Sequence, residues 1–368
     1  MNAAHVALFL SFSGHGGVER MVANLAGGLA RGGLRVDLVL ARTEGGHAGS
    51  WPEGVRVVAL GTRHTHSALP ALVAYLRRER PVAMLAAKDR AIRVAVVARR
   101  LAGVPLRLVG RLGTTVTAAL ADRSALTRSL WYLGMRGVYP RLDALVAVSE
   151  GVAADVSAIT GLPAERVAVV RNPVITPELE RLAAAGPGQR APAGGHDAPV
   201  ILGMGRLTRQ KDFPTLLRAF ARVRAGRPCR LLILGEGRER GELADLARSL
   251  GVEADVALPG FLANPYPDLA AADVFVLSSA WEGSPNALTE AMALGTPVVA
   301  TDCPSGPREI LRGGAVAPLV AVGDEAAMAD AIRAQLERPT PAGRLREAVR
   351  EYHVDVSAGA YAQVLGVG

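Results

Sequence analysis

The sequence predicts an α/β protein with two domains, each built on a parallel sheet with helices on both faces. Short apolar runs alternate with amphipathic helical runs, a pattern typical of the strands and helices of a parallel sheet. The 368 residues are long for one hydrophobic core and comfortable for two. A stretch rich in Ala, Gly and Pro predicts a linker at 176–199. We therefore expect a first domain over 1–175, a second over 200–350 and a closing helix in 351–368.

Charge is divided unevenly between the two halves. Residues 1–175 hold 22 Lys and Arg against 11 Asp and Glu, a balance of +11, whereas the remaining residues hold 20 against 23, a balance of −3. Only Lys88 and Lys211 are lysines. A basic first half favours an anionic partner, and phospholipid headgroups, a polyprenyl phosphate, an acidic glycan and nucleic acid all meet that description.

Cysteine usage and hydropathy indicate a cytoplasmic protein. The two cysteines, Cys229 and Cys303, are too few for a disulfide framework and belong to no metal-binding motif. The apolar run at 6–12 lacks basic flanks and is too short for a signal peptide or a spanning helix. We expect a reducing compartment and no structural zinc.

The first domain opens with a strand at 5–10, a loop that contains Gly14, Gly16 and Gly17, and a helix from about 18 to 31. Such a loop between strand and helix is typical of phosphate sites, although glycines there are as often plain turn residues. His15 in this loop is either a ligand-binding group or an exposed histidine. Further strands and helices are expected at 35–41, 55–60, 69–78, 83–86, 92–101, 106–109, 145–149, 151–159 and 167–170.

Residues 122–142 differ in composition from the rest of the first domain, because large apolar side chains are mixed with arginines there. The apolar ones are Leu126, Leu130, Trp131, Leu133, Met135 and Tyr139, and the basic ones are Arg123, Arg128, Arg136 and Arg141. Basic amphipathic helices lie on anionic membrane surfaces. An ordinary helix that faces the core and carries solvated arginines has the same pattern. The sequence leaves both interpretations open.

The second domain opens with a buried strand at 200–204, after which come Gly205, Arg206 and Lys211. A helix begins near Asp212 with a proline in its first turn. Two cations in the turn between a strand and a helix suit an anionic ligand, and the alternative is a pair of surface cations. Strands are then expected at 231–234, 256–258 and 273–277, with Gly235 after the first and Gly260 and Phe261 after the second.

Residues 280–310 hold two carboxylates, Glu282 in a loop and Glu290 inside a helix. That helix is expected to end at Gly295, before a short buried strand at 298–300. Its first amides, those of Asn286, Ala287 and Leu288, are expected to be unpaired and to form an anion site, to which the preceding proline contributes no N–H.

The runs E-G-S-P-N-A-L-T-E-A at 282–291, G-G-V-E-R at 16–20, G-R-L-T-R-Q-K-D-F at 205–213 and L-G-E-G at 234–237 resemble the motifs of glycosyltransferase family four, in the same order. The resemblance is strongest over 200–310. It implies the GT-B fold, in which two Rossmann-like domains with parallel sheets face each other across a cleft, and the C-terminal helix crosses back onto the first domain.

The resemblance also implies the roles of site residues. Arg206 and Lys211 are expected to hold the donor diphosphate, Glu282 the sugar hydroxyls and Glu290 the ribose hydroxyls. The expected catalytic residues are Arg206, Lys211 and Glu282. The full donor side comprises Gly16, Gly17, Gly205, Arg206, Lys211, Gly235, Gly260, Phe261, Glu282, Gly283, Ser284, Asn286, Ala287, Leu288 and Glu290.

The acceptor side departs from the family pattern. Many relatives carry a first-domain histidine that faces the donor sugar, and residues 106–117 contain none. We expect Arg111 to occupy that place, with His15 as a second acceptor-side residue.

The resemblance implies a retaining hexosyl- or N-acetylhexosaminyltransferase. It uses a nucleotide diphosphate sugar, with UDP favoured because residues 303–310 are similar to bacterial surface-glycan transferases. The acceptor is a glycan or a lipid-linked saccharide of bacterial polysaccharide, lipopolysaccharide or glycolipid synthesis. We expect no metal or other cofactor, since cationic side chains take the place of a metal. We also expect peripheral attachment to the inner face of the cell membrane through 122–142.

Two other functions stay open. One is a sugar-nucleotide 2-epimerase, which shares the fold. The other is a non-enzymatic basic binding protein on the same scaffold. Nucleic acid is not an expected partner, because the first domain has no recognisable nucleic-acid motif.

Overall fold

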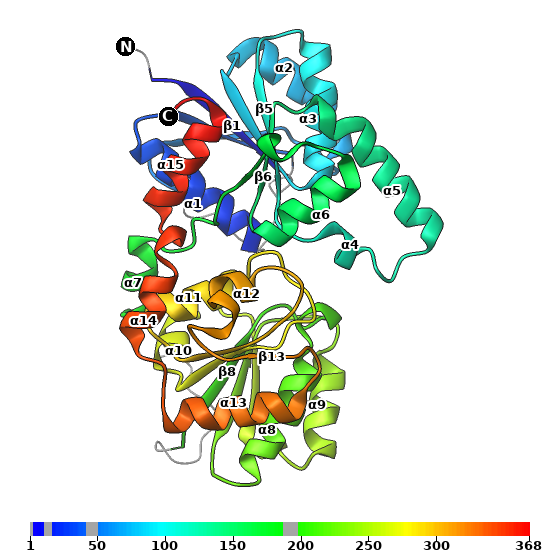
Figure 1. Ribbon diagram of the computed structural model, residues 1–368. Helices are drawn as coiled ribbons and strands as arrows, with labels where there is room; N and C mark the ends of the chain where they lie inside the picture. The colour runs from blue at the N-terminus through cyan, green and yellow to red at the C-terminus, as the bar shows by residue number, and fades with distance from the viewer. Residues whose placement is uncertain (1–2, 11–16, 42–50, 187–197) are drawn as a thin grey trace. The chain divides into compact units, whose positions relative to one another are not determined.

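The computed structural model describes residues 3–10, 17–41, 51–186 and 198–368 and divides the chain into two compact units (Figure 1). The first unit extends to Val174 and also includes the chain from Tyr352 to Gly368. The second unit comprises Ile175–Glu351. The C-terminal end of the chain therefore belongs to the first unit.

The first unit contains a seven-stranded parallel sheet in the order β3-β2-β1-β4-β5-β6-β7. The strands are β1 (His5–Leu10), β2 (Arg35–Leu40), β3 (Val55–Ala59), β4 (Ala83–Ala87), β5 (Arg107–Leu112), β6 (Ala144–Ala147) and β7 (Val167–Val169). Every residue of β1 and of β4 is buried. Continuous burial is typical of central strands that have helices on both faces.

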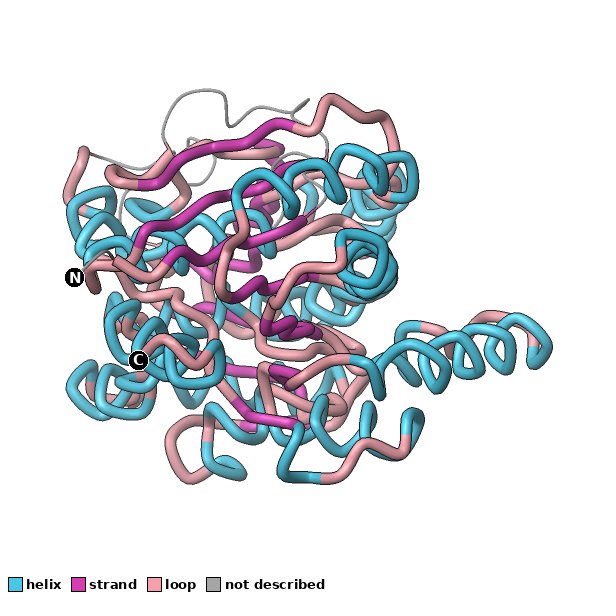
Figure 2. The backbone as a smooth tube through the Cα atoms, turned by 90° about the horizontal axis from the view of Figure 1, so that it is seen from above, coloured by secondary structure: helices cyan, strands magenta, loops and turns pink. Residues whose placement is uncertain are grey.

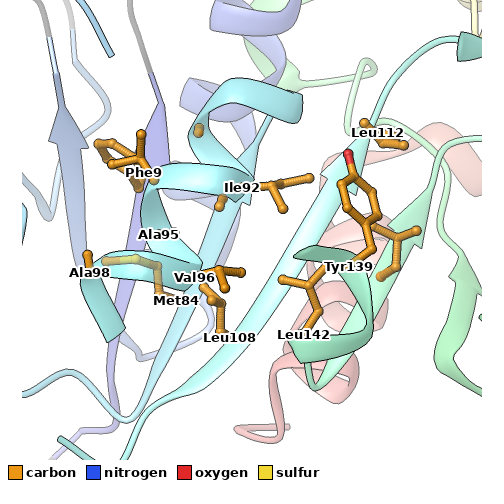
Figure 3. Close-up of a cluster of buried hydrophobic side chains, with 14 of the residues drawn as sticks. Phe9, Met84, Ile92, Ala95, Val96, Ala98, Leu108, Leu112, Tyr139 and Leu142 are labelled. Carbon is orange, nitrogen blue, oxygen red and sulfur yellow. The ribbon is translucent and has the colours of Figure 1, made fainter. Parts of the chain in front are cut away.

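Helices cover both faces of this sheet. They are α1 (Gly17–Arg31), η1 (His66–Ala68), α2 (Leu69–Glu79), α3 (Asp89–Ala102), α4 (Val116–Ala119), α5 (Ala125–Val138), η2 (Tyr139–Arg141), α6 (Glu150–Thr160), η3 (Ala164–Arg166) and α15 (Val354–Leu365). Phe9 and Met84 face one core, shared with Ile92 of α3 (Figure 3). Their neighbours Leu8 and Leu85 face a second core, formed with α1 and α15. The period-2 alternation of strand side chains thus divides the interior into two layers.

The closing helix packs on α1 within the first unit, as the resemblance predicts. A Cβ atom at Gly28 of α1 would lie 2.9 Å from the Cβ atom of Ala358 and 2.9 Å from Cγ2 of Val354. Arg31 and Asp355 form an ion pair at 3.0 Å. Glycine at position 28 therefore allows the close approach of the two helices.

The second unit contains a six-stranded parallel sheet in the order β10-β9-β8-β11-β12-β13. The strands are β8 (Val200–Met204), β9 (Arg230–Leu234), β10 (Val256–Gly260), β11 (Val274–Leu277), β12 (Val298–Thr301) and β13 (Leu319–Val320). The helices are α7 (Pro177–Ala183), η4 (Arg209–Lys211), α8 (Phe213–Arg224), α9 (Arg240–Ser249), η5 (Glu253–Asp255), α10 (Tyr266–Ala271), α11 (Asn286–Leu294), α12 (Pro307–Ile310), η6 (Arg312–Gly314), α13 (Glu325–Glu337) and α14 (Ala342–Ala348), with η7 (Arg350–Tyr352) at the unit boundary.

The predicted linker contains a short helix. Helix α7 lies within it and packs on α10, where Asn264 Nδ2 donates to the carbonyl of Leu182 at 2.9 Å. Leu179 on the same helix is buried. The remaining part, 187–197, lies outside the described residues.

Both sheets reverse their strand order at one internal position. In the first unit the reversal falls between β1 and β4, and in the second between β8 and β11. In open parallel sheets, ligands bind beyond the carboxyl ends of the strands at such a switch point. The loops that follow these four strands are therefore where each unit is expected to hold a ligand.

The close contact between α1 and α15 can be tested with a matched pair of alanine substitutions. Both Gly28→Ala and Gly359→Ala improve helix propensity, by roughly 1 kcal/mol. A Cβ atom at Gly359 would meet nothing within 4 Å. We expect Gly359→Ala to raise the thermal unfolding midpoint, and Gly28→Ala to lower it because overpacking costs about 1–3 kcal/mol. An increase in both variants would contradict the close packing of the two helices.

Candidate functional site

The loops after β8 and β9 pack so closely that only glycine fits between them. A Cβ atom at Gly235 would lie 1.9 Å from the carbonyl oxygen of Gly205, and one at Gly237 would lie 2.1 Å from that of Leu207. The amide of Gly205 donates to the carbonyl of Leu234 at 2.9 Å. These contacts extend the ordered backbone beyond the sheet and hold the loop that carries Arg206 and Lys211.

Lys211 and Glu282 form an ion pair across the switch point of the second unit. The distance between Lys211 Nζ and Glu282 Oε1 is 2.5 Å, and the two side chains are 17% and 8% exposed. Ser279 Oγ donates to the same carboxylate oxygen at 2.7 Å. A carboxylate that is nearly removed from water is thus compensated by a cation and a hydroxyl.

Main-chain contacts support this ion pair. Ser278 Oγ donates to the carbonyl of Lys211 at 2.7 Å. The amide of Ala280 donates to the carbonyl of Gln210 at 2.8 Å. The two loops that carry the ion pair are therefore fastened to each other through both backbone and side chains.

Arg206 lies on the same loop as Lys211 and is exposed. Among the residues that the structure describes, its guanidinium has no hydrogen-bond or ion-pair partner. Phe261, which follows β10, is 47% exposed although it is a large aromatic residue. The second unit therefore presents an exposed guanidinium and a half-exposed aromatic ring on the loops that follow β8 and β10.

The start of α11 differs in one respect from the sequence prediction. The amide of Leu288 donates to the carbonyl of Pro285 at 3.1 Å, so the prediction that this amide is unpaired is wrong. The first helical turn closes on the carbonyl of the capping proline, which uses that donor. The amide of Ala287 has no acceptor in the described part of the chain, and Ser284 Oγ is buried without a partner there.

The loop before α11 is held by residues 302–306. Ser305 Oγ donates to the carbonyl of Gly283 at 3.2 Å. Gly306 has φ +76°, and a Cβ atom there would lie 2.8 Å from Cδ of Pro285. The loop that carries Glu282 is thereby supported from the side of β12.

Glu290 is only 2% exposed and lies inside α11. Tyr266 of α10 directs its hydroxyl to Glu290 Oε1 at 3.4 Å. Neither Tyr266 nor Ser279 is among the site residues predicted from the sequence, because both lie outside the recognised motifs. Nothing in the local sequence around these two residues indicates a contact with a carboxylate.

The candidate residues of the first unit are only partly described. His15 and Gly16 lie outside the described residues, and Gly17 begins α1. Arg111 is 2% exposed, and its Nη2 donates to Asn172 Oδ1 at 2.7 Å. These contacts are interior ones, and a role of Arg111 toward an acceptor stays a prediction.

Helix α5, in the segment at 122–142, has one buried face and one exposed face. Trp131 packs against the core beneath Arg93, whose Cζ lies 5.6 Å from the ring centroid. On the outer face, Leu126, Leu130 and Leu133 are 70%, 60% and 66% exposed. The helix projects from the rest of the first unit in both views (Figures 1 and 2). One face is therefore a core face, and the other is an exposed leucine stripe.

Two further properties concern metals and membranes. Within 3–10, 17–41, 51–186 and 198–368, no group of three or more His, Cys, Asp or Glu side chains could hold a metal ion. None of the helices in these ranges is long and apolar enough to span a membrane.

Comparisons with known proteins identify the family of this chain. A family model described as "Glycosyl transferases group 1" matches residues 198–338, and one described as "Glycosyl transferase 4-like domain" matches residues 16–173. The lipopolysaccharide core biosynthesis glycosyltransferase LpsE of Rhizobium meliloti is 43% identical over 136 residues, which make up 37% of this chain and 39% of LpsE.

A second relative is the N-acetylgalactosamine-N,N'-diacetylbacillosaminyl-diphospho-undecaprenol 4-alpha-N-acetylgalactosaminyltransferase of Campylobacter jejuni. It is 32% identical over 201 residues, which cover 54% of this chain and 52% of the relative. The matched segments thus span 39% and 52% of these two relatives. Among solved structures, HepE of Anabaena in complex with UDP-glucose has a TM-score of 0.76 at 19% identity, covering 98% of this chain and 99% of HepE. That likeness shows a shared fold.

Both cysteines of the second unit are buried and are expected to be unreactive. Burial raises the pKa of the Cys229 thiol to about 11 and that of Cys303 to about 12, and the Glu282 carboxylate adds to the second effect. Both thiols therefore stay protonated at pH 8, and the thiolate is the reactive form. We expect a chromogenic disulfide reagent at pH 8 to label neither cysteine in the folded protein and both in urea. Stoichiometric labelling before unfolding, assigned with Cys229→Ser and Cys303→Ser, would contradict this environment.

Proposed function

The chain belongs to the group 1 glycosyltransferases and has their GT-B fold, and we propose that it moves a sugar from a nucleotide diphosphate sugar to a saccharide or lipid-linked acceptor. The observation that carries this proposal is the ion pair between Lys211 and Glu282 at the switch point of the second unit. With Arg206 on the same loop, it presents a fixed carboxylate and two cations where open parallel sheets bind ligands.

The cations are suited to the departing diphosphate. The leaving group gains negative charge as its bond to the sugar breaks, and preorganised cations stabilise that charge without reorganising during the reaction. Arg206 supplies an exposed guanidinium, and Lys211 supplies an ammonium group that the ion pair holds in place. The Ala287 amide at the start of α11 adds a helix-terminal donor, which suits a phosphate oxygen.

The carboxylates are suited to binding hydroxyl groups. Glu282 is held through one oxygen by Lys211 and Ser279, which makes it a rigid acceptor for a sugar hydroxyl and a poor nucleophile. Glu290 lies inside a helix and is hydrogen-bonded to Tyr266, an arrangement that supports contact with the ribose hydroxyls. A glycosidase-like pair of acid and nucleophile fits these environments poorly.

We therefore propose transfer with retention on the leaving-group face. The bond between the anomeric carbon and the diphosphate oxygen breaks, and its electron pair stays with the phosphate. The acceptor oxygen bonds to the anomeric carbon on the same face, and the acceptor proton passes to the departing phosphate oxygen. The chain's residues hold the diphosphate and the sugar, and no protein nucleophile takes part.

UDP is the nucleotide that we propose, with a hexose or N-acetylhexosamine as the sugar. The similarity of residues 303–310 to surface-glycan transferases supports this choice. The names of LpsE and of the Campylobacter relative support an acceptor in lipopolysaccharide or lipid-linked glycan synthesis. A 2-epimerase and a non-enzymatic binding protein are the alternatives that measurement must exclude.

A calorimetric titration with UDP, GDP and ADP tests the donor site. We expect UDP to bind at least tenfold more tightly than GDP or ADP. Lys211→Ala should weaken UDP binding roughly 10–100-fold because it removes a charge-assisted bond to phosphate. Glu290→Ala should weaken it through the loss of ribose contacts. Arg218→Ala, which changes an exposed cation on the outer helix α8, serves as the control and should bind UDP as the unmodified protein does. Failure of all three nucleotides to bind would favour the binding-protein alternative.

We also propose that α5 attaches the protein to an anionic membrane surface on the cytoplasmic side. The exposed leucine stripe provides apolar side chains that could enter the interface, and Arg123 and Arg136 are exposed on the same segment. Apolar burial and attraction to anionic headgroups act together in interfacial helices. The excess positive charge of residues 1–175 acts in the same direction.

Vesicle sedimentation tests this attachment. We expect binding to vesicles that contain the anionic lipid phosphatidylglycerol, because basic protein surfaces are attracted to anionic headgroups. Replacement of Leu126, Leu130 and Leu133 by Ser should reduce the bound fraction at least fivefold, since each leucine contributes apolar burial. Leu101→Ser changes a leucine of α3 that is 52% exposed and is the control. An equal loss in the control, or none in the triple variant, would rule out α5 as the contact.

A further inference from the structure

Lys88 occupies an unusual position in the first unit. It is one of two lysines among 42 basic residues, and it follows β4 directly at the start of α3. Its backbone has φ +76° and ψ +148°, a conformation that residues with a Cβ atom rarely adopt. Its amide donates to the carbonyl of Arg111 at 3.2 Å, and its carbonyl accepts from Ile92 at 3.1 Å. These bonds hold Lys88 at the carboxyl end of the sheet.

The side chain of Lys88 spans the switch point of the first unit. Its Nζ lies 2.9 Å from Glu19 Oε1, and Glu19 stands in the first turn of α1, after β1. The Glu19 side chain is 2% exposed, whereas that of Lys88 is 40% exposed. The ammonium group is therefore positioned by a buried carboxylate and still accessible.

The two units have equivalent ion pairs at equivalent places. In the second unit Lys211 follows β8 and Glu282 follows β11, the two strands that flank the switch point. In the first unit Glu19 follows β1 and Lys88 follows β4, so the two residue types exchange positions. Each of the chain's two lysines thus lies where an open parallel sheet binds its ligand.

The surroundings of Lys88 carry excess positive charge. Glu19 is compensated by Lys88, and Asp89 by Arg93 at 2.8 Å. Arg111 pairs with Ala87 in the backbone register of β4 and β5, and its guanidinium donates to Asn172 after β7. It has no carboxylate partner in the described part of the chain. Its Nε atom is buried without a hydrogen bond there. A buried cation without a counter-charge is costly, and an anion bound nearby lowers that cost.

We propose that Lys88 binds a phosphate group of the acceptor. The ammonium group has three N–H donors, and one bond to Glu19 leaves two for phosphate oxygens. The inference rests on the proposed transferase function in that it calls the ligand the acceptor. The site itself is defined by its ability to bind a phosphate group. The phosphate belongs either to a lipid-linked diphosphate or to a soluble sugar phosphate.

Lysine-selective acetylation distinguishes the two sites because the chain has one lysine in each unit. A short pulse of reagent, followed by peptide mass spectrometry, gives separate labelling rates for Lys88 and Lys211. We expect UDP to protect Lys211. With UDP saturating, farnesyl diphosphate or glucose 6-phosphate should slow the labelling of Lys88 at least fivefold, and farnesol should not. If farnesyl diphosphate protects Lys88, the phosphate belongs to a lipid-linked diphosphate; if glucose 6-phosphate protects it, the phosphate belongs to a soluble sugar phosphate.

Each outcome decides one proposal. Protection of Lys211 by UDP with no protection of Lys88 by either phosphate ligand overturns the inference and leaves the transferase proposal intact. Protection of Lys88 without protection of Lys211 supports the phosphate site and contradicts the proposed donor site. Protection of Lys88 by farnesol as strongly as by farnesyl diphosphate also overturns the inference.

Variants separate ligand binding from a structural role. Lys88→Gln should weaken binding of the protecting phosphate ligand roughly tenfold or more, the loss expected for one charge-assisted hydrogen bond, and leave UDP affinity unchanged. Lys88→Arg should restore much of this affinity. Arg90→Gln changes an exposed cation two residues away and should bind as the unmodified protein does. An equal loss in Lys88→Gln and Arg90→Gln would mean general charge attraction and would overturn the site.

Discussion

The ion pair between Lys211 and Glu282 is the interaction on which the site of the second unit depends. Its two charges lie mostly out of water, where each alone would be strongly unfavourable. It fastens the loop after β8 to the loop after β11, and Ser278 and Ser279 add bonds to the same two loops. Removal of either charge would leave the other buried and would also remove one of the contacts between the two loops. Ligand binding and local order therefore depend on the same pair.

The backbone makes this pair possible through close contacts that side chains would prevent. Gly235 and Gly237 let the loop after β9 lie against Gly205 and Leu207, which extends the ordered chain beyond the strands. On the other side, Gly306 lies against the loop that carries Glu282. Of the expected donor glycines, Gly235 thus has a packing role against Gly205. In the first unit Gly28 has a similar role, because the absence of a side chain there allows α15 to pack closely on α1.

Much of the fold could be predicted because the spacing of hydrophobic residues along the sequence indicates which side chains are buried. The strands at the centre of each sheet are short apolar runs, and the closing helix predicted within 351–368 is observed at Val354–Leu365. The site was less accessible to prediction. Leu288 was expected to offer a free amide, but the first turn of α11 closes on Pro285. Tyr266 and Ser279 reach the two carboxylates from outside any motif, so no local signal marked them.

The sequence by itself determined the α/β class, the family resemblance and the identity of the charged residues, since periodicity and motif spacing are local properties of the chain. Only the tertiary structure decided which charges meet. The pairing of Glu19 with Lys88 and of Lys211 with Glu282 joins residues 69 and 71 positions apart. The tertiary structure also decided that the leucines of α5 face outward while Trp131 faces the core. Strand order and helix rotation set these contacts, and both depend on packing between distant segments.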